Sequence, residues 1–319
     1  MSTPPFDAGA VHLRLRWEGG CARDVNLRLE RPAAAAAMRG RPAEQAVRML
    51  PLLYSICGAA QGVAASLALR AARGEAQAPA IAAAVLAEAR REHLWRLLLD
   101  WPRLLALPQQ QALLIEGRRR LQEGGFDGWM EEALREPFAR IEQALGEQAE
   151  PPPVRDAQWL PSLTAAETLV LWPRLDAGFA AAPTYLGKPA ETGALARHPD
   201  LLAGAAPLLA RVEARMADLT AADGLGRTSA APVAPGVGRA AVETARGLLL
   251  HEITLDGDSV ADYVIVAPTE WNFHAQGILA AWLQGAVATT PGELKALAAR
   301  AVLALDPCVR CEIALDENA

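Results

Sequence analysis

Residues 49–69 read MLPLLYSICGAAQGVAASLAL and carry no charged side chain between Arg48 and Arg70. A run of this length could cross a bilayer as a helix. However, it contains Pro51, several polar residues and much alanine, so it is less apolar than a typical membrane-spanning segment. We therefore predict a central, buried helix of a globular protein with no membrane span, which Pro51 begins or bends.

The composition of the 319-residue chain is that of a globular protein, with 52% hydrophobic and 21% charged residues. This excludes disordered, collagen-like and mucin-like chains. The formal net charge is −6, and no basic stripe carries interleaved aromatic residues, which argues against nucleic-acid binding. Four cysteines do not make a disulfide scaffold in so long a chain. The first residues lack the basic and apolar parts of a signal peptide, so we expect a cytoplasmic protein.

Alternating apolar and polar residues predict two β-hairpins. The first spans Val11–Glu30 and turns at Glu18-Gly19-Gly20, and the second spans Val242–Val266 and turns at Asp256-Gly257-Asp258. Apolar spacing predicts helices at residues 81–99, 121–144, 201–219, 276–283 and 291–305. The fold class is therefore α+β and mostly helical. We expect a single domain over residues 1–319, and the three consecutive prolines after Glu150 admit an internal break near residues 148–156.

The sharpest local signal for chemistry is the segment Asp306-Pro307-Cys308-Val309-Arg310-Cys311. Two thiols separated by two residues can bind one soft metal, because a turn brings both sulfurs to the same side. No second pair exists, so the motif is only half of a zinc site. A redox pair is an alternative, although thioredoxin-like motifs follow an early strand and do not lie at the end of a chain. Two thiols that bind nothing are the other alternative.

The remaining cysteines and the histidines give weaker signals. Cys57 lies in the apolar stretch, where a cysteine is more often an inert core residue than a ligand. Cys21, in the turn of the first hairpin, has no companion. His251 and His274 could bind a metal, but a lone histidine near a strand end more often only satisfies hydrogen bonds. We expect two further histidines, His93 and His198, to be surface residues.

Several separated segments together resemble the large subunit of nickel–iron hydrogenases. In chain order they are Ser55-Ile56-Cys57-Gly58, Gly187–Gly193 with Leu195-Ala196-Arg197, Glu243–Gly247, Pro268–Asn272 and Asp306–Cys311. Each match is short, but the order is preserved as far as the last cysteine. Within that superfamily the chain is most similar to the shorter maturation scaffolds of the HupK/HoxV type. The resemblance implies a large-subunit-like helical core with small antiparallel β-hairpins.

The departures from the hydrogenase pattern imply that catalysis is lost. Where the hydrogenases have the second cysteine of the N-terminal pair and the histidine after it, this chain has Ala60 and Ala64. The leading arginine of that motif is replaced by Ser55, and the proton-transferring glutamate falls by rough alignment in Ala33–Ala37. Splitting hydrogen requires both metals and a placed base. Ala314 replaces the histidine that marks a cleaved C-terminal extension, so we also expect no such cleavage.

The residues that remain are those on the iron side of the hydrogenase site. The resemblance implies that Cys308 and Cys311 chelate one low-valent iron and that Cys57 joins them. Arg246 matches the arginine beside the cyanide ligands on that iron, and a guanidinium can donate hydrogen bonds to such anions. A salt bridge to Glu243 or another carboxylate would explain Arg246 equally well. The implied cofactor is iron with cyanide and carbon monoxide ligands, bound transiently and without nickel.

The resemblance favours a hydrogenase expression/formation protein, not an enzyme, that acts as a scaffold or chaperone in assembling the Fe(CN)2(CO) moiety. Its implied partners are the hydrogenase large-subunit precursor and the maturation chaperones. Two alternatives stay open. A divergent catalytic hydrogenase, or a related oxidoreductase subunit, would contain nickel and take up hydrogen. A metal-free or zinc-binding interaction module would lack iron and its infrared bands. Under the first hypothesis Cys57 should lie close to the C-terminal pair of cysteines.

Overall fold

The computed structural model describes residues 9–31, 34–54, 56–154, 156–203, 206–220 and 224–317. Ala33, Ser55 and Arg155, which belong to segments discussed above, lie outside these ranges. The helices are α1 (Ala43–Leu53), α2 (Gly58–Ala72), α3 (Ala83–Trp95), α4 (Trp101–Leu104), α5 (Gln111–Glu123), α6 (Phe126–Gly146), α7 (Ala165–Leu171), α8 (Ala177–Ala181), α9 (Ala194–Arg197), α10 (Pro207–Thr220), α11 (Pro268–Asn272), α12 (Ile278–Leu283) and α13 (Pro291–Leu305). The strands are β1 (Ala10–Glu18), β2 (Cys21–Glu30), β3 (Gln77–Ile81), β4 (Gln158–Trp159), β5 (Ala190–Glu191), β6 (Arg227–Ala234), β7 (Val237–Thr244), β8 (Gly247–Asp256), β9 (Ser259–Val266) and β10 (Arg310–Glu317).

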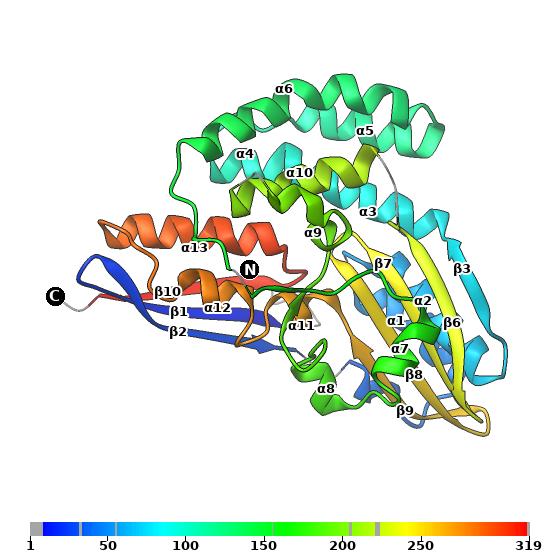
Figure 1. Cartoon of the computed structure of the whole chain (residues 1–319). Helices are drawn as coiled ribbons and strands as arrows, with labels where there is room; N and C mark the ends of the chain where they lie inside the picture. Colours follow the sequence, from blue (N-terminus) through cyan, green and yellow to red (C-terminus); the bar gives the residue numbers. More distant parts are fainter. Residues whose placement is uncertain are drawn as a thin grey trace, which may run out of the picture.

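Two sheets, each with its own apolar core, organise these elements (Figure 1). The three-stranded sheet has the order β10-β1-β2, and its core includes side chains of α12, α13, α10 and the α5–α6 pair. The five-stranded sheet has the order β3-β6-β7-β8-β9. Helices α1 and α2 pack against it, and so do the short helices α7 and α8. A third pairing joins β4 to β5.

The five-stranded sheet is covered on both faces, which explains why its sequence alternates so little. Every residue of β7 is buried. Neighbouring residues of β7 enter different apolar clusters, since Ala240 packs with α1 and α2 whereas Ala241 packs with α7. The second predicted hairpin is confirmed as β8 and β9, which the structure joins through Gly257. The observed hairpin begins at Gly247, because the first residues of the predicted one, Val242–Thr244, belong to β7. It is part of a larger sheet, and the sequence did not predict strands β3 and β6.

The apolar stretch at residues 49–69 forms parts of two helices, so the prediction of one continuous helix is wrong. Helix α1 ends at Leu53, and α2 begins at Gly58 and packs against α1. A Cβ atom on Gly58 would lie 2.9 Å from the carbonyl oxygen of Pro51, so the approach of the two helices requires glycine. The prediction of a buried core segment is confirmed for most of α2, whereas Leu52 of α1 is exposed. Among the described residues no helix has both the length and the apolar character needed to cross a membrane.

The first hairpin is confirmed as β1 and β2, with Gly19 and Gly20 both at positive φ in the turn. Strand β10 then pairs with β1 in parallel, with Val11 opposite Cys311, and this pairing was not predicted. It returns the last segment of the chain to the end of the first hairpin. Helix α13 has the predicted bounds.

Four other predicted helices differ in their bounds, and one of them, predicted at 276–283, begins at Ile278 as α12. The helix predicted at 81–99 begins two residues later and runs through a π-helical turn at Arg96–Asp100 into α4. The one predicted at 121–144 is divided by Gly124 and Gly125, because both have positive φ. The helix predicted at 201–219 begins at Pro207 as α10. At the predicted internal break, Gln148 and Ala149 accept hydrogen bonds from Arg300 of α13, and the division itself stays a prediction.

Candidate functional site

The matched motifs meet in the region between the two sheets. Arg31 follows β2, Cys57 precedes α2, and Arg246 lies in the turn between β7 and β8. Thr269 belongs to α11, and Cys308 follows α13. The sequence motifs are far apart along the chain, and the parallel return of β10 to β1 brings the last of them to the end of the first hairpin.

Cys57 is the N-cap residue of α2 and not a residue inside a helix. Its side chain makes no capping hydrogen bond. Instead the Glu88 carboxylate of α3 accepts hydrogen bonds from the backbone N–H groups of Ala59 (2.7 Å) and Ala60 (3.0 Å). Glu88 thus caps the first turn of α2 from outside, and this fixes the backbone that carries Cys57.

The thiol of Cys57 is sensitive to Cys308 and Arg246. Burial, together with the nearby Cys308, raises the pKa of Cys57 to about 12, whereas Arg246 acts in the opposite direction. The charges of Cys308 and Arg246 therefore affect the pKa of Cys57, and those of Cys308 and Cys57 affect the pKa of Arg246. A cavity of about 10 Å³, room for a single water, is lined by Cys57, Glu88, Glu92 and Arg246.

Cys308 has two polar partners at its sulfur. Arg31 Nη2 donates to Cys308 Sγ at 3.2 Å, and Thr269 Oγ1 lies 3.1 Å from the same atom. Arg31 is in turn paired with Glu270, with Nε 2.9 Å from Oε1. Burial alone would lower the pKa of Arg31, but Glu270 and Cys308 outweigh it and raise that pKa overall. Arg31 therefore stays a cation beside the sulfur, where hydrogen-bond donors stabilise negative charge.

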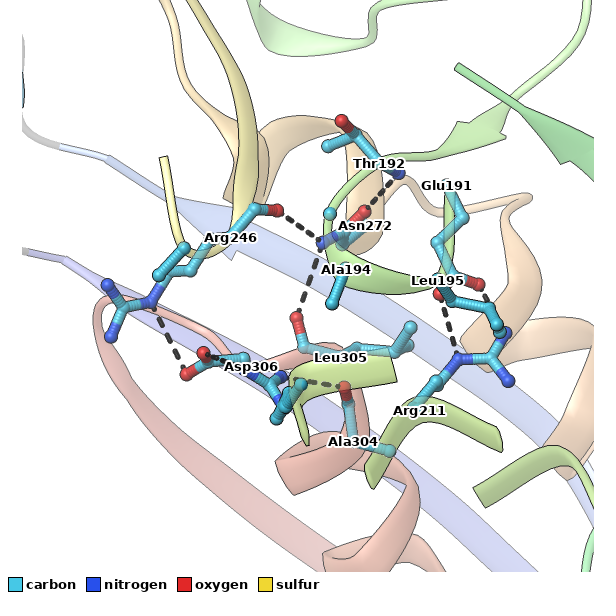
Figure 2. Close-up of a pocket in the computed structure, with 13 residues that line it drawn as sticks. Glu191, Thr192, Ala194, Leu195, Arg211, Arg246, Asn272, Ala304, Leu305 and Asp306 are labelled. Atoms are coloured by element: carbon cyan, nitrogen blue, oxygen red, sulfur yellow. Dashed lines mark hydrogen bonds and ion pairs between the residues drawn. The ribbon is translucent and has the colours of Figure 1, made fainter. Parts of the chain in front are cut away.

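Arg246 is held by carboxylates other than the one the sequence suggested. Its Nη2 donates to Glu92 Oε2 at 2.6 Å, and its Nε lies 3.3 Å from Asp306 Oδ1. Glu243 pairs with Arg197 instead, at 3.0 Å. Figure 2 shows Arg246 and Asp306 facing one another across the ends of their loops. The salt-bridge interpretation of Arg246 is thus realised, and its role toward a cyanide ligand stays a prediction.

The carboxylate of Asp306, two residues before Cys308, lies beside three guanidinium groups. It accepts hydrogen bonds from Arg96 Nε at 2.7 Å and from Arg215 Nη1 at 3.0 Å, in addition to its pairing with Arg246. Burial would raise the pKa of Asp306, but the three arginines hold it well below its usual range. Asp306 also has positive φ (56°) at the C-cap of α13. The segment leading to Cys308 is therefore fixed by charge as well as by backbone shape.

Cys311 is placed differently from Cys308. It is the second residue of β10 and lies on the same face as Ile313 and Leu315. Its side chain packs against the apolar core of the three-stranded sheet. Burial raises the pKa of Cys311 to about 12, with a contribution from Glu312. All four cysteines are free. Among the described residues, no group of three or more His, Cys, Asp or Glu side chains is arranged to hold a metal ion.

One histidine is placed differently from expectation, whereas another satisfies hydrogen bonds within a strand, as expected. His93 is fully buried in α3, with Nε2 2.9 Å from Asp218 Oδ2, so its prediction as a surface residue is wrong. His251 is also fully buried, within β8. Sequence reasoning missed Arg31, Glu88 and Glu270 as site residues. Only Glu270 carried a signal, because it replaces a threonine of the hydrogenase motif Pro-Thr-Thr-Trp-Asn.

Comparison with curated proteins finds relatives over nearly the full length of the chain. It is 35% identical to the hydrogenase expression/formation protein HupK of Azotobacter vinelandii, in a match that covers 96% of this chain and 98% of the relative. It is 30% identical to the hydrogenase expression/formation protein HoxV of Cupriavidus necator, over 91% of this chain and 92% of the relative. No protein-family model matches the chain.

Solved structures with a similar fold are hydrogenase large subunits. The nickel–iron–selenium hydrogenase of Desulfomicrobium baculatum gives a TM-score of 0.65 at 14% identity, covering 92% of this chain and 95% of that chain. The corresponding enzyme of D. vulgaris Hildenborough gives 0.57 at 17% identity, covering 92% and 94%. These matches confirm the predicted α+β, large-subunit-like fold.

Proposed function

The chain belongs to the HupK/HoxV family of hydrogenase expression/formation proteins, and we propose that its part in hydrogenase formation is to hold an iron atom that carries cyanide and carbon monoxide ligands. In this proposal the chain is a non-catalytic scaffold. It receives the iron complex as cargo and passes it to a hydrogenase large-subunit precursor. Its partners are that precursor and the maturation chaperones, and the transfer takes place in the cytoplasm.

The observation that carries the proposal is that each of two cysteines lies beside an arginine, since Arg31 donates to Cys308 Sγ at 3.2 Å and Arg246 lines one small cavity together with Cys57. Thiolates are soft ligands and suit low-valent iron. An iron atom that brings three diatomic ligands needs few ligands from the protein, so a pair of sulfurs is compatible with the absence of a larger ligand group among the described residues. The arginines would donate hydrogen bonds to the anionic cyanides.

The surroundings of the lost hydrogenase ligands favour a scaffold over an enzyme. Ala60 and Ala64 stand where the hydrogenases have a cysteine and a histidine, and both are fully buried. They pack in an apolar cluster with Val85 and Val242. These positions therefore offer neither a second metal ligand nor a proton acceptor, both of which hydrogen cleavage requires.

A cavity beside Cys308 supports transfer between proteins. It has a volume of about 370 Å³, and Arg31, Tyr54 and Glu270 contribute to its wall. Arg31 also donates to the Cys308 sulfur, so this wall lies directly beside the proposed ligand. Moving an iron atom between thiolates requires the incoming ligand to reach the metal, and we propose that this ligand approaches from the cavity past Arg31.

The test is to purify the protein anaerobically from a host with the maturation machinery, and to measure bound iron together with the infrared bands of cyanide and carbon monoxide. We expect Cys308→Ala to remove both the iron and the bands, and Cys21→Ala to leave both unchanged. Arg246→Ala should keep the iron and move the cyanide stretches, because it removes a hydrogen-bond donor and not a ligand. Loss of iron in Cys21→Ala but not in Cys308→Ala would contradict the proposed site.

The same experiment decides which sulfur acts with Cys308. The sequence motif pairs Cys308 with Cys311, but Cys311 packs against an apolar core, whereas the charge of Cys308 influences Cys57. Iron lost in Cys57→Ala and kept in Cys311→Ala would assign the second ligand to Cys57. The reverse result would require β10 to release Cys311 when iron binds. Both variants should be compared at equal folded fraction.

A further inference from the structure

We infer that Gln61 is a positioning residue for Cys57 that donates to its sulfur, and that the orientation of the Gln61 amide is coupled through His251 to Tyr263. The inference rests on the proposed function, because it concerns Cys57 as an iron ligand. It adds residues to which no role in iron binding was assigned from the sequence.

The side chains form a buried chain of hydrogen bonds that ends on the sulfur. Gln61 Nε2 lies 3.8 Å from Cys57 Sγ, and Gln61 Oε1 lies 2.9 Å from His251 Nε2. The hydroxyl of Tyr263 lies 2.8 Å from His251 Nδ1. Gln61, His251 and Tyr263 are at most 2% exposed. A buried amide or imidazole without partners is destabilising, so the members of this chain depend on one another.

The direction of the chain follows from the orientation of the Gln61 amide, whose Oε1 faces His251 and whose Nε2 faces Cys57. Burial lowers the pKa of His251 to about 3, so its ring is neutral at physiological pH and has one donor and one acceptor nitrogen. Gln61 Oε1 can only accept, so His251 Nε2 carries the proton. His251 Nδ1 must then accept from the Tyr263 hydroxyl. With its oxygen engaged, the Gln61 amide turns its N–H group toward Cys57 Sγ.

A donor at this sulfur has a consequence that a merely structural amide would not have. A metal-bound sulfur has no proton of its own and accepts hydrogen bonds. A donated hydrogen bond withdraws electron density from the sulfur and so from the iron. Less density at the iron weakens its back-donation to carbon monoxide, which raises the carbon monoxide stretching frequency. Removing the donor should therefore lower that frequency.

The loaded protein provides the first test. Gln61→Met keeps the length of the side chain and removes its N–H group. We expect the variant to fold, to bind iron and to show the carbon monoxide stretch at a lower wavenumber than the wild type, with a smaller shift in the same direction for Tyr263→Phe. Thr228→Val is the matched control, because Thr228 is a buried polar residue of the same sheet that hydrogen-bonds to Ala80 and Gln77 instead. An unchanged stretch in iron-loaded Gln61→Met would overturn the inference.

A second test needs no iron and no variant. The chain contains 5 histidines, so ¹⁵N-histidine labelling allows the tautomer of His251 to be determined by NMR in the iron-free protein. We expect the tautomer with the proton on Nε2. A proton on Nδ1 would overturn the inference, because Gln61 would then present its oxygen to the sulfur. The two claims can fail separately. If the wild type purified from the competent host contains no iron but has the proton on His251 Nε2, the proposed function is contradicted and the orientation of Gln61 is supported.

Discussion

Replacing Asp306 with asparagine should destabilise the protein far more than replacing a surface aspartate. Asp306 is 1% exposed and faces Arg96, Arg215 and Arg246. Asparagine keeps the shape and one acceptor oxygen but leaves these buried cations without their shared counter-charge. Breaking a buried ion pair costs about 3–5 kcal/mol, and the retained oxygen places the expected loss near the lower end, ~3 kcal/mol.

Urea unfolding followed by tryptophan fluorescence measures this loss. The pKa of Asp306 is depressed in the folded protein, so its contribution is fully present above the unfolded value of about 3.9 and is lost as the pH falls toward the folded value. The difference between wild type and Asp306→Asn should therefore be constant from pH 7 to pH 5 and shrink below about pH 4. Asp262→Asn is the control, because its pairing with Arg39 is exposed and worth about 0–1 kcal/mol. Equal losses in both variants at pH 7 would refute the reasoning.

Three further predictions concern the elements around the site. Glu88→Ala should lower the free energy of unfolding by about 1–2 kcal/mol, because the first turn of α2 loses its cap, and thermal unfolding against Glu88→Gln measures this. Gly238→Ala should prevent folding, since its Cβ would lie 2.1 Å from the backbone nitrogen of Ala72; a native circular dichroism spectrum with an unchanged melting temperature would contradict it. Raised pKa values should make Cys57 and Cys311 react with iodoacetamide more slowly at pH 8 in the native protein than in urea, and faster as the pH rises to 10, as measured by peptide mass spectrometry.

The parts of the fold that the sequence predicted depend on local patterns. Helix α13 has its N-cap at Thr290 and a proline at its start, so both signals lie within a few residues of the boundary. The two hairpins have glycine at their turns. The pairing of β10 with β1 joins residues from opposite ends of the chain. It could not be predicted, because the sequence of neither segment indicates which strand it pairs with. The division of the apolar stretch was missed for a similar reason, because Gly58 is explained only by the approach of Pro51.

The candidate site was predicted in part. The resemblance to hydrogenases pointed to Cys57, Cys308, Cys311 and Arg246. Cys57 and Arg246 line one small cavity, whereas Cys311 packs against an apolar core, and iron binding by these residues stays a prediction. The resemblance could not supply Glu88, whose partners are backbone groups of another helix and so depend on tertiary packing alone. Nor could it supply Arg31, which has no counterpart in the motifs and acts through a contact that only the folded chain creates.

Infrared spectroscopy of the wild-type protein, purified anaerobically from cells that assemble an active nickel–iron hydrogenase, tests iron binding most directly. We predict carbon monoxide and cyanide stretching bands together with bound iron, and the loss of both in Cys308→Ala at an unchanged melting temperature. Wild-type protein from such cells that contains neither iron nor these bands, or bands that persist in Cys308→Ala, would contradict the proposed role as an iron scaffold.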